Sequence, residues 1–181
     1  MVHFVGAGSG AVDLITIRGK RLLEEADVII YAGSLVNPAL LEYAGKDCQI
    51  HNSAYLHLDE VIELMKQAEA KGLMTVRLHT GDPSVYGAIR EQMDRLKSAG
   101  IAYEVCPGVS SFCGAAAALK AEYTLPGVSQ SVIITRMAGR TPVREQGRMR
   151  DLAAHQAKMV IFLSMGLLKE LTEELIAGGY Q

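Results

Sequence analysis

The chain of 181 residues is 49% hydrophobic and 21% charged, a balance that is typical of a globular protein and excludes a disordered chain. Its formal net charge of -2 offers no general attraction to a phosphate backbone, so nucleic acid is not expected as a partner. Its apolar runs fall short of the roughly 20 residues of a membrane span, and it opens on a strand-like segment without a leader, which predicts a cytoplasmic protein with no membrane partner.

Short β-branched segments alternate with segments of helical periodicity, a pattern that is typical of a mainly parallel sheet covered by helices. The predicted strands span residues 2–5, 28–31, 74–78, 101–105, 132–135 and 159–163. The predicted helices span residues 14–26, 58–70, 89–96, 144–155 and 167–177. These elements place the chain in the α/β class.

The helical pattern breaks at Leu125-Pro126-Gly127, after an alanine-rich stretch, and a domain boundary is predicted there. We assign an N-terminal α/β domain to residues 1–122 and a C-terminal α/β domain to residues 123–181. Only two strands are predicted in the second domain, too few to close a core comfortably, so this domain is expected to be incomplete.

The three cysteines, Cys48, Cys106 and Cys113, show neither CxxC spacing nor a neighbouring histidine array. This spacing predicts buried, reduced thiols, and it predicts neither a disulfide framework nor a metal site.

The first glycine loop, Gly6-Ala7-Gly8-Ser9-Gly10-Ala11, follows a strand and precedes a helix. It matches the GxGxxG/A pattern of dinucleotide-binding proteins, whose glycines let backbone N–H groups approach a pyrophosphate. Those proteins also carry an acidic residue at the end of the second strand, whereas Asp27 precedes that strand here. The loop alone leaves open a dinucleotide-dependent oxidoreductase, another bound molecule, or a tight turn without a ligand.

Two further turns follow the third and fourth predicted strands. In His79-Thr80-Gly81-Asp82-Pro83-Ser84-Val85-Tyr86-Gly87, Asp82 and Pro83 suit the start of a helix, but a helix start does not explain Gly81 or Tyr86-Gly87. Pro107-Gly108-Val109-Ser110-Ser111-Phe112 brings two hydroxyls to another helix start. Because the carboxyl ends of parallel strands meet at one edge of a sheet, the three turns predict a bound small molecule at that edge.

Five motifs, taken in chain order, carry a family resemblance. They are GAGSGAVDLITIRG, DVIIYAGSLVNP, RLHTGDPSVYGAIREQ, PGVSSFCGAAAALKAEYTLPGVSQSVIITR and MAGRTP. Together they resemble the successive signatures of the tetrapyrrole methylases, in particular the branch that methylates C11 of precorrin-4 or cobalt-precorrin-4. The resemblance runs from Val2 to about Leu163.

The resemblance implies an S-adenosylmethionine-dependent C-methyltransferase of cobalamin (vitamin B12) biosynthesis. It implies two α/β domains with S-adenosylmethionine in the cleft between them and the tetrapyrrole beside it, S-adenosylhomocysteine as a product, and a homodimer. Methyl transfer from a sulfonium to carbon needs no metal and no enzyme nucleophile, since alignment supplies most of the acceleration. No residue is therefore assigned a certain catalytic role.

The resemblance also carries site residues to this sequence. The cofactor-binding residues are Thr80, Gly81, Asp82, Val85, Ser110, Ser111, Met137 and Met165. The substrate-binding residues are Gly8, Ser9, Gly10, Arg136 and Arg140, the two arginines as clamps for the carboxylates of the substrate. The candidates for positioning are His79, Asp82 and Tyr86. Core packing remains the alternative for both methionines.

Two features depart from the family pattern. The first loop reads Gly8-Ser9-Gly10-Ala11-Val12 where the family usually has a GPGDP-like sequence, and it lacks both the proline and the aspartate. Family members also continue beyond Gln181. A non-catalytic tetrapyrrole-binding relative is therefore a second alternative, beside the oxidoreductase.

Overall fold

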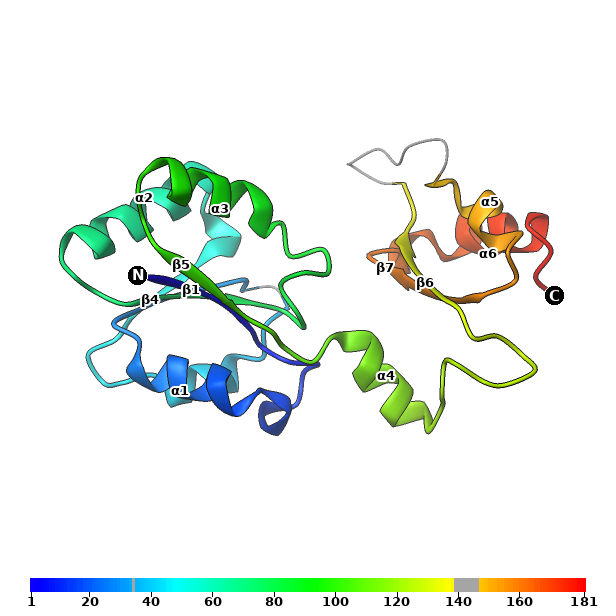
Figure 1. Ribbon diagram of the computed structural model, residues 1–181, viewed down its shortest axis with the longest axis horizontal. Helices are drawn as coiled ribbons and strands as arrows, with labels where there is room; N and C mark the ends of the chain where they lie inside the picture. Colours follow the sequence, from blue (N-terminus) through cyan, green and yellow to red (C-terminus); the bar gives the residue numbers. More distant parts are fainter. Residues whose placement is uncertain (34, 139–146) are drawn as a thin grey trace. The chain divides into compact units, whose positions relative to one another are not determined.

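The computed structural model describes residues 1–33, 35–138 and 147–181, and its contacts divide the chain into two units (Figure 1). The first unit is Met1–Ala115 and the second is Ala116–Gln181. Each unit contains a parallel sheet and helices, so the predicted α/β class is confirmed. No helix in the described part of the chain is both long and apolar enough to span a membrane.

The first unit contains a five-stranded parallel sheet with the strand order β3-β2-β4-β1-β5. Its strands are β1 (Val2–Gly6), β2 (Val28–Tyr31), β3 (Gln49–Asn52), β4 (Thr75–His79) and β5 (Tyr103–Cys106). Its helices are α1 (Ile17–Glu25), α2 (Leu58–Ala70) and α3 (Ile89–Ser98), and it also contains the first half of α4 (Ser111–Leu119). Its 3₁₀ turns are η1 (Val12–Leu14), η2 (Pro38–Tyr43) and η3 (Ser53–Tyr55).

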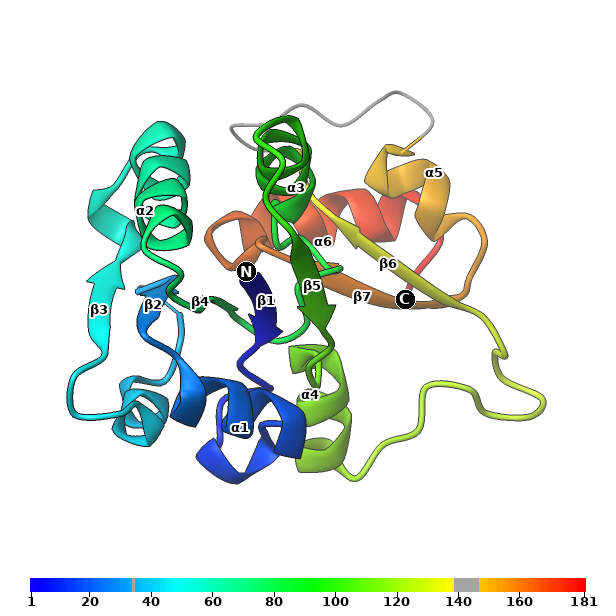
Figure 2. The ribbon, with the colours of Figure 1, turned by 60° about the vertical axis from the view of Figure 1, so that its left-hand side comes forward.

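Helix α1 covers one face of this sheet, and α2 and α3 cover the other (Figures 1 and 2). Successive side chains of a strand point to opposite faces, so Val5 of β1 packs with the α1 core while its neighbour Phe4 packs with the α2 and α3 core. Both side chains are fully buried. Burial of one such side chain stabilises the fold by about 1.5–3 kcal/mol.

Local signals explain where two helices begin. Helix α1 begins at Ile17 because the Thr16 hydroxyl accepts a hydrogen bond from the Gly19 N–H at 3.0 Å. The predicted helix began at residue 14, but η1 and an extended Thr16 come first. Helix α2 has the predicted bounds, and at its start the Glu60 carboxylate accepts from the His57 N–H at 2.7 Å.

Three sequence-based expectations need correction. Strand β3 was not predicted, because Gln49–Asn52 is a mostly polar edge strand with no apolar alternation. The contacts divide the chain within α4, none of whose residues is buried, whereas the predicted boundary followed residue 122. Among the cysteines only Cys106 is buried; Cys48 is half-buried and Cys113 is exposed.

The second unit has a two-stranded parallel sheet formed by β6 (Val132–Arg136) and β7 (Lys158–Phe162). Its helices are α5 (Met149–Ala153) and α6 (Leu168–Ala177), with the 3₁₀ turn η5 (Met165–Leu167) before α6. Helices α5 and α6 pack together, and Arg150 pairs with Glu174 at 3.0 Å between them. The predicted helix over 144–155 is shorter in the described residues, and its first three residues lie outside them.

Candidate functional site

The three predicted turns lie side by side, because β4, β1 and β5 are neighbouring parallel strands. The Ala7 N–H donates to the His79 carbonyl at 2.7 Å. Gly8 and Gly81 exchange two backbone hydrogen bonds, at 3.2 and 3.0 Å. The prediction that these turns share one edge of the sheet is therefore confirmed, and we call this place the carboxyl edge of the first unit.

Two glycines, Gly6 and Gly108, allow the turns to approach this closely. A Cβ on Gly6 would lie 2.6 Å from both the Gly108 Cα and the Gly81 oxygen, and one on Gly108 would lie 2.2 Å from that oxygen. Ordinary contacts of a Cβ are 3.4–4 Å. The backbones of the three turns are consequently in direct contact at this point.

Asp82 fastens the turn after β4 to the turn after β5. Its carboxylate accepts from the Ser84 N–H at 2.8 Å and from the Gly108 N–H at 2.8 Å, and it also contacts the Ser84 hydroxyl. Partial burial raises the pKa of the Asp82 carboxyl, but these hydrogen bonds outweigh it and the pKa lies below its ordinary value. Asp82 is therefore an anionic tie between two loops.

Asp82 and Pro83 do not start a helix, which was the simpler of the two interpretations of this motif, and the helix predicted from residue 89 is the one that forms. Residues 83–86 form a turn, and α3 begins only at Ile89. Asp82 closes that turn locally through the Ser84 N–H, as an Asx residue does in a loop, and its second oxygen reaches Gly108. The sequence motif could not reveal this second partner.

His79 lies under the carboxyl edge and is 4% exposed. Its ring stacks on Phe4 with a centroid distance of 6.0 Å. Burial, together with the nearby Arg77 charge, lowers the pKa of His79 to about 3, so the imidazole is neutral at physiological pH. Its Nε2 is buried without a hydrogen-bond partner among the described residues.

The other predicted residues of the first unit surround the same edge. Ser110 is buried, Ser111 is exposed at the first position of α4, and Thr80 and Val85 are half-buried. Tyr86 is 43% exposed. All of these residues belong to the segments that follow β4 and β5.

The first glycine loop is held from two sides. Gly8 and Gly10 have positive φ angles of 82° and 127°, which glycine adopts without a Cβ penalty. Ser9 packs against Gly114, where a Cβ would lie only 2.6 Å from the Ser9 Cβ. The Asn37 amide donates to the Gly10 carbonyl at 2.8 Å.

Asn37 is a supporting residue that the sequence analysis missed. Its side-chain oxygen also accepts from the Ala39 N–H at 3.1 Å, so the same side chain begins η2 and supports the glycine loop. The motif DVIIYAGSLVNP contains this asparagine, but only the fold brings it to Gly10.

The second unit has a carboxyl edge of its own, at the ends of β6 and β7. The Met137 N–H donates to the Ser164 hydroxyl at 3.0 Å, and that hydroxyl donates to the Phe162 carbonyl at 2.7 Å. Met165 follows directly and is 80% exposed. Exposure of this size contradicts core packing for Met165, whereas Met137 is half-buried.

Arg136 ends β6 beside a hollow of about 310 Å³. Its guanidinium donates to the Met137 carbonyl at 3.2 Å. The hollow is also lined by Glu170 and Glu174, so the charges beside Arg136 are mixed. Arg140, the second predicted clamp, lies outside the described residues.

Two observations weigh against a dinucleotide at the first glycine loop. Helix α1 begins at Ile17, well after the glycines, so its N-terminus does not adjoin the loop as in a dinucleotide fingerprint. Asp27 lies at the amino end of β2, where its carboxylate accepts from the Met74 N–H at 2.7 Å. This carboxylate is at the wrong end of the strand to bind a ribose.

The chemistry of the first carboxyl edge is neutral apart from one anion. Segments 6–10, 79–87 and 107–112 contain no lysine or arginine, and Asp82 is their one acidic residue. Backbone carbonyls, hydroxyls and a single carboxylate suit a ligand that carries positive charge and hydroxyl groups. Within the described residues, no group of three or more His, Cys, Asp or Glu side chains is placed to hold a metal ion.

Comparisons with known proteins agree on one family. The model of the family described as tetrapyrrole (corrin/porphyrin) methylases matches residues 1–181. A cobalt-precorrin-4 C(11)-methyltransferase from Methanocaldococcus jannaschii is 57% identical over 180 residues, which are 99% of this chain and 70% of the relative. A precorrin-4 C(11)-methyltransferase from Pseudomonas aeruginosa is 49% identical over 177 residues, which are 97% of this chain and 70% of the relative.

Solved structures show the same likeness. A cobalt precorrin-4 methyltransferase, described as a cobalamin biosynthetic enzyme, matches with a TM-score of 0.96 and 44% identity, over 99% of this chain and 75% of that one. A uroporphyrin-III C-methyl transferase from Thermus thermophilus, complexed with S-adenyl homocysteine, matches with a TM-score of 0.80 and 26% identity, over 99% and 73% of the two chains.

Proposed function

This chain belongs to the tetrapyrrole methylase family, and we propose that it transfers the methyl group of S-adenosylmethionine to C11 of precorrin-4 or cobalt-precorrin-4 in cobalamin biosynthesis. The comparisons confirm the family resemblance that the five motifs indicated. Two relatives that carry this activity in their names are 57% and 49% identical to nearly the whole chain, which supports the choice of substrate.

The observation that carries the proposal is the charge of the first carboxyl edge. The loops offer backbone carbonyls, hydroxyls and one carboxylate, and none of the three contains a cationic side chain. A sulfonium is a cation, so it meets no like charge from these loops. When bound, S-adenosylmethionine supplies an electrophilic methyl group to a carbon of the electron-rich tetrapyrrole.

The residues of this chain then bind and orient, and none supplies a nucleophile. Gly81 and Thr80 offer backbone and hydroxyl groups to the cofactor, as do Ser110 and Ser111, with Val85 against an apolar part. Asp82 fixes the loops that present these groups. Preorganised dipoles of this kind need no rearrangement during the reaction.

We also propose that Met137 and Met165, at the carboxyl edge of the second unit, contact the cofactor. For the substrate, the proposal assigns Gly8, Ser9 and Gly10 as backbone contacts and Arg136 and Arg140 as carboxylate clamps. His79 is neutral at physiological pH, so it carries no extra proton to donate as an imidazolium, and we assign it a role as a hydrogen-bonding group.

The decisive experiment incubates the protein separately with precorrin-4 and cobalt-precorrin-4 in the presence of methyl-labelled S-adenosylmethionine. Mass spectrometry and NMR of the product should show one added labelled methyl group at C11. In parallel, S-adenosylhomocysteine should raise the melting temperature, while NAD(H) and NADP(H) should not. Binding of S-adenosylhomocysteine and of the tetrapyrrole without labelled product would identify a non-catalytic relative. Stabilisation by a nicotinamide nucleotide alone would identify an oxidoreductase.

Two further parts of the proposal concern assembly and location. We propose a homodimer, which light scattering on the purified chain measures directly as a molar mass of twice 19.5 kDa. We also propose a cytoplasmic location, which cell fractionation tests.

A further inference from the structure

A turn over residues 86–88 joins the loop after β4 to α3 in a conformation that most side chains avoid. Tyr86 and Ala88 have φ angles of 56° and 50°, in the left-handed region. Between them, a Cβ on Gly87 would lie 2.2 Å from the Pro83 oxygen, so the chain folds back tightly on itself. Two non-glycine residues in this region persist only where their surroundings hold them.

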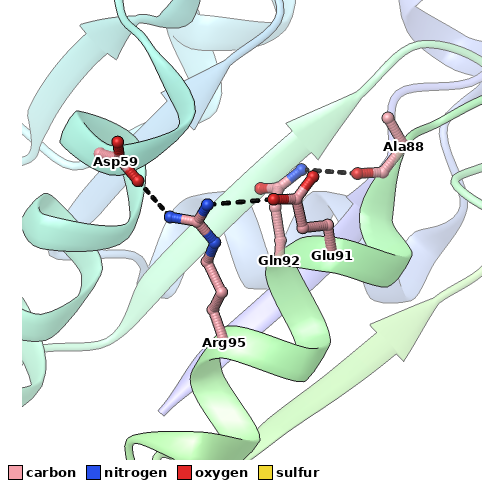
Figure 3. Close-up of polar contacts among 5 residues, drawn as sticks. All are labelled: Asp59, Ala88, Glu91, Gln92 and Arg95. Carbon is pink, nitrogen blue, oxygen red and sulfur yellow. Dashed lines mark hydrogen bonds and ion pairs between the residues drawn. The ribbon is translucent and has the colours of Figure 1, made fainter.

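The buried side chain of Gln92 holds the end of this turn. Its Nε2 donates to the Ala88 carbonyl at 3.1 Å (Figure 3), and its Oε1 accepts from Arg77 Nε at 3.2 Å. A guanidinium can only donate, so the Gln92 oxygen must face Arg77 and its NH₂ group must face Ala88. The orientation of the amide is therefore determined by chemistry.

Arg77 in turn is held by the sheet. It is 8% exposed on the central strand β4, and its Nη1 donates to the Ile30 carbonyl of β2 at 3.1 Å. Burial lowers the pKa of Arg77 to about 10, so the guanidinium keeps its charge at neutral pH. No ion pair found in the described part of the chain includes Arg77. Its charge instead strengthens the hydrogen bond to Gln92 and polarises that amide toward Ala88.

We propose that Arg77 and Gln92 are positioning residues, which lock the left-handed turn 86–88 so that the Tyr86 ring packs against the face of the tetrapyrrole. The ring is 43% exposed and follows the fastened Gly81-Asp82 segment at the carboxyl edge. An aromatic ring offers its face to a broad conjugated macrocycle, and rings pair in this way with geometric preference. The role of Tyr86 rests on the proposed methyltransferase function, whereas the role of Arg77 and Gln92 in holding the turn does not.

The test separates the two bonds of Gln92. Gln92→Glu keeps an acceptor for Arg77 and so keeps the buried charge satisfied, but its carboxylate cannot donate to Ala88. The KM for the tetrapyrrole should rise about tenfold, the size expected for one lost hydrogen bond. The KM for S-adenosylmethionine should stay unchanged, and the amides of residues 86–88 should exchange faster with deuterium.

Three further variants sharpen the result. Adding Ala88→Gly to Gln92→Glu should restore much of the KM, since glycine adopts positive φ without a Cβ penalty. In a Tyr86→Leu background, Gln92→Glu should not raise the KM for the tetrapyrrole further, because Arg77 and Gln92 act on the substrate through Tyr86. The matched control is Arg95→Gln on the same helix, which breaks the ion pairs with Asp59 and Glu91 (Figure 3) and should leave both KM values unchanged.

The outcomes distinguish this inference from the proposed function. A wild-type chain that methylates neither tetrapyrrole refutes the function, and the role of Tyr86 with it. If wild type is active, equal rises in both KM values, or a full effect of Gln92→Glu in the Tyr86→Leu background, overturn the positioning role. If the amides of residues 86–88 exchange at the wild-type rate in Gln92→Glu, then Gln92 does not hold this turn, whatever the activity of the variant.

Discussion

Replacement of Gly108 by alanine tests whether the backbones of the turns after β1, β4 and β5 are in direct contact. The new Cβ would lie 2.2 Å from the Gly81 oxygen and 2.8 Å from the Gly6 Cα, while ordinary contacts begin at 3.4 Å. All of these neighbouring atoms belong to the backbone, so no side chain can rotate away. The strand ends must separate by more than an ångström.

The magnitude follows from what that separation breaks. Overpacking of a tight contact costs about 1–3 kcal/mol, and loss of the hydrogen bond from the Gly108 N–H to the Asp82 carboxylate costs about 1.5–3 kcal/mol more. We expect the first unit to lose roughly 3–5 kcal/mol, a large part of the ~5–15 kcal/mol typical of a folded domain. Binding of S-adenosylhomocysteine should weaken with it.

Native-state amide exchange in β1 and β4 measures the stability of this unit, and titration calorimetry measures the binding. Gly45→Ala is the matched control, since the nearest atom to its Cβ is the Glu24 oxygen at 3.9 Å and its φ is not left-handed. That variant should gain about 0.4–1 kcal/mol by restricting the unfolded chain. A Gly108→Ala protein as stable as Gly45→Ala would refute the close approach of the three loops.

Three other predictions concern single side chains. The folded pKa of Asp82 lies below its unfolded value near 3.8, so its contribution to stability is complete above pH 3.8 and is lost as the pH falls through the folded pKa. Asp82→Asn should lower the free energy of unfolding by about 1–2 kcal/mol at pH 7. In urea titrations at acidic pH, the variant should lack the part of the stability loss that protonation of Asp82 causes in wild type. His79 has a folded pKa of about 3 against 6.5 in the unfolded chain, so its contribution to stability is full above pH 6.5 and falls by up to about 1.4 kcal/mol per pH unit toward pH 3. Between pH 7 and pH 5 the free energy of unfolding should therefore fall more steeply in wild type than in His79→Gln, which keeps only the smaller dependence from other groups such as His3. Thr16→Ala should cost about 1 kcal/mol by removing the cap of α1, and Thr16→Ser should recover most of it in thermal unfolding.

Local periodicity was enough to predict most elements of the fold. Helix α2 has its predicted bounds because Val61, Ile62, Met65 and Ala68 lie on one stripe, and all four are buried. Strand β2 likewise has its predicted bounds, because a run of apolar β-branched residues fits a strand covered on both faces. The α/β class follows from the alternation of these elements, and with it the meeting of three turns at one edge.

The partners of the site residues were decided by the tertiary structure. The motif around Asp82 reads as a helix start, yet the carboxylate closes a turn and reaches Gly108 on a different strand end. Arg77 and Gln92 are the first and last residues of the motif RLHTGDPSVYGAIREQ, but nothing in that motif shows that their side chains form a hydrogen bond. A sequence pattern records which side chains share a face of one element, whereas hydrogen bonds between elements depend on the order in which strands are placed side by side.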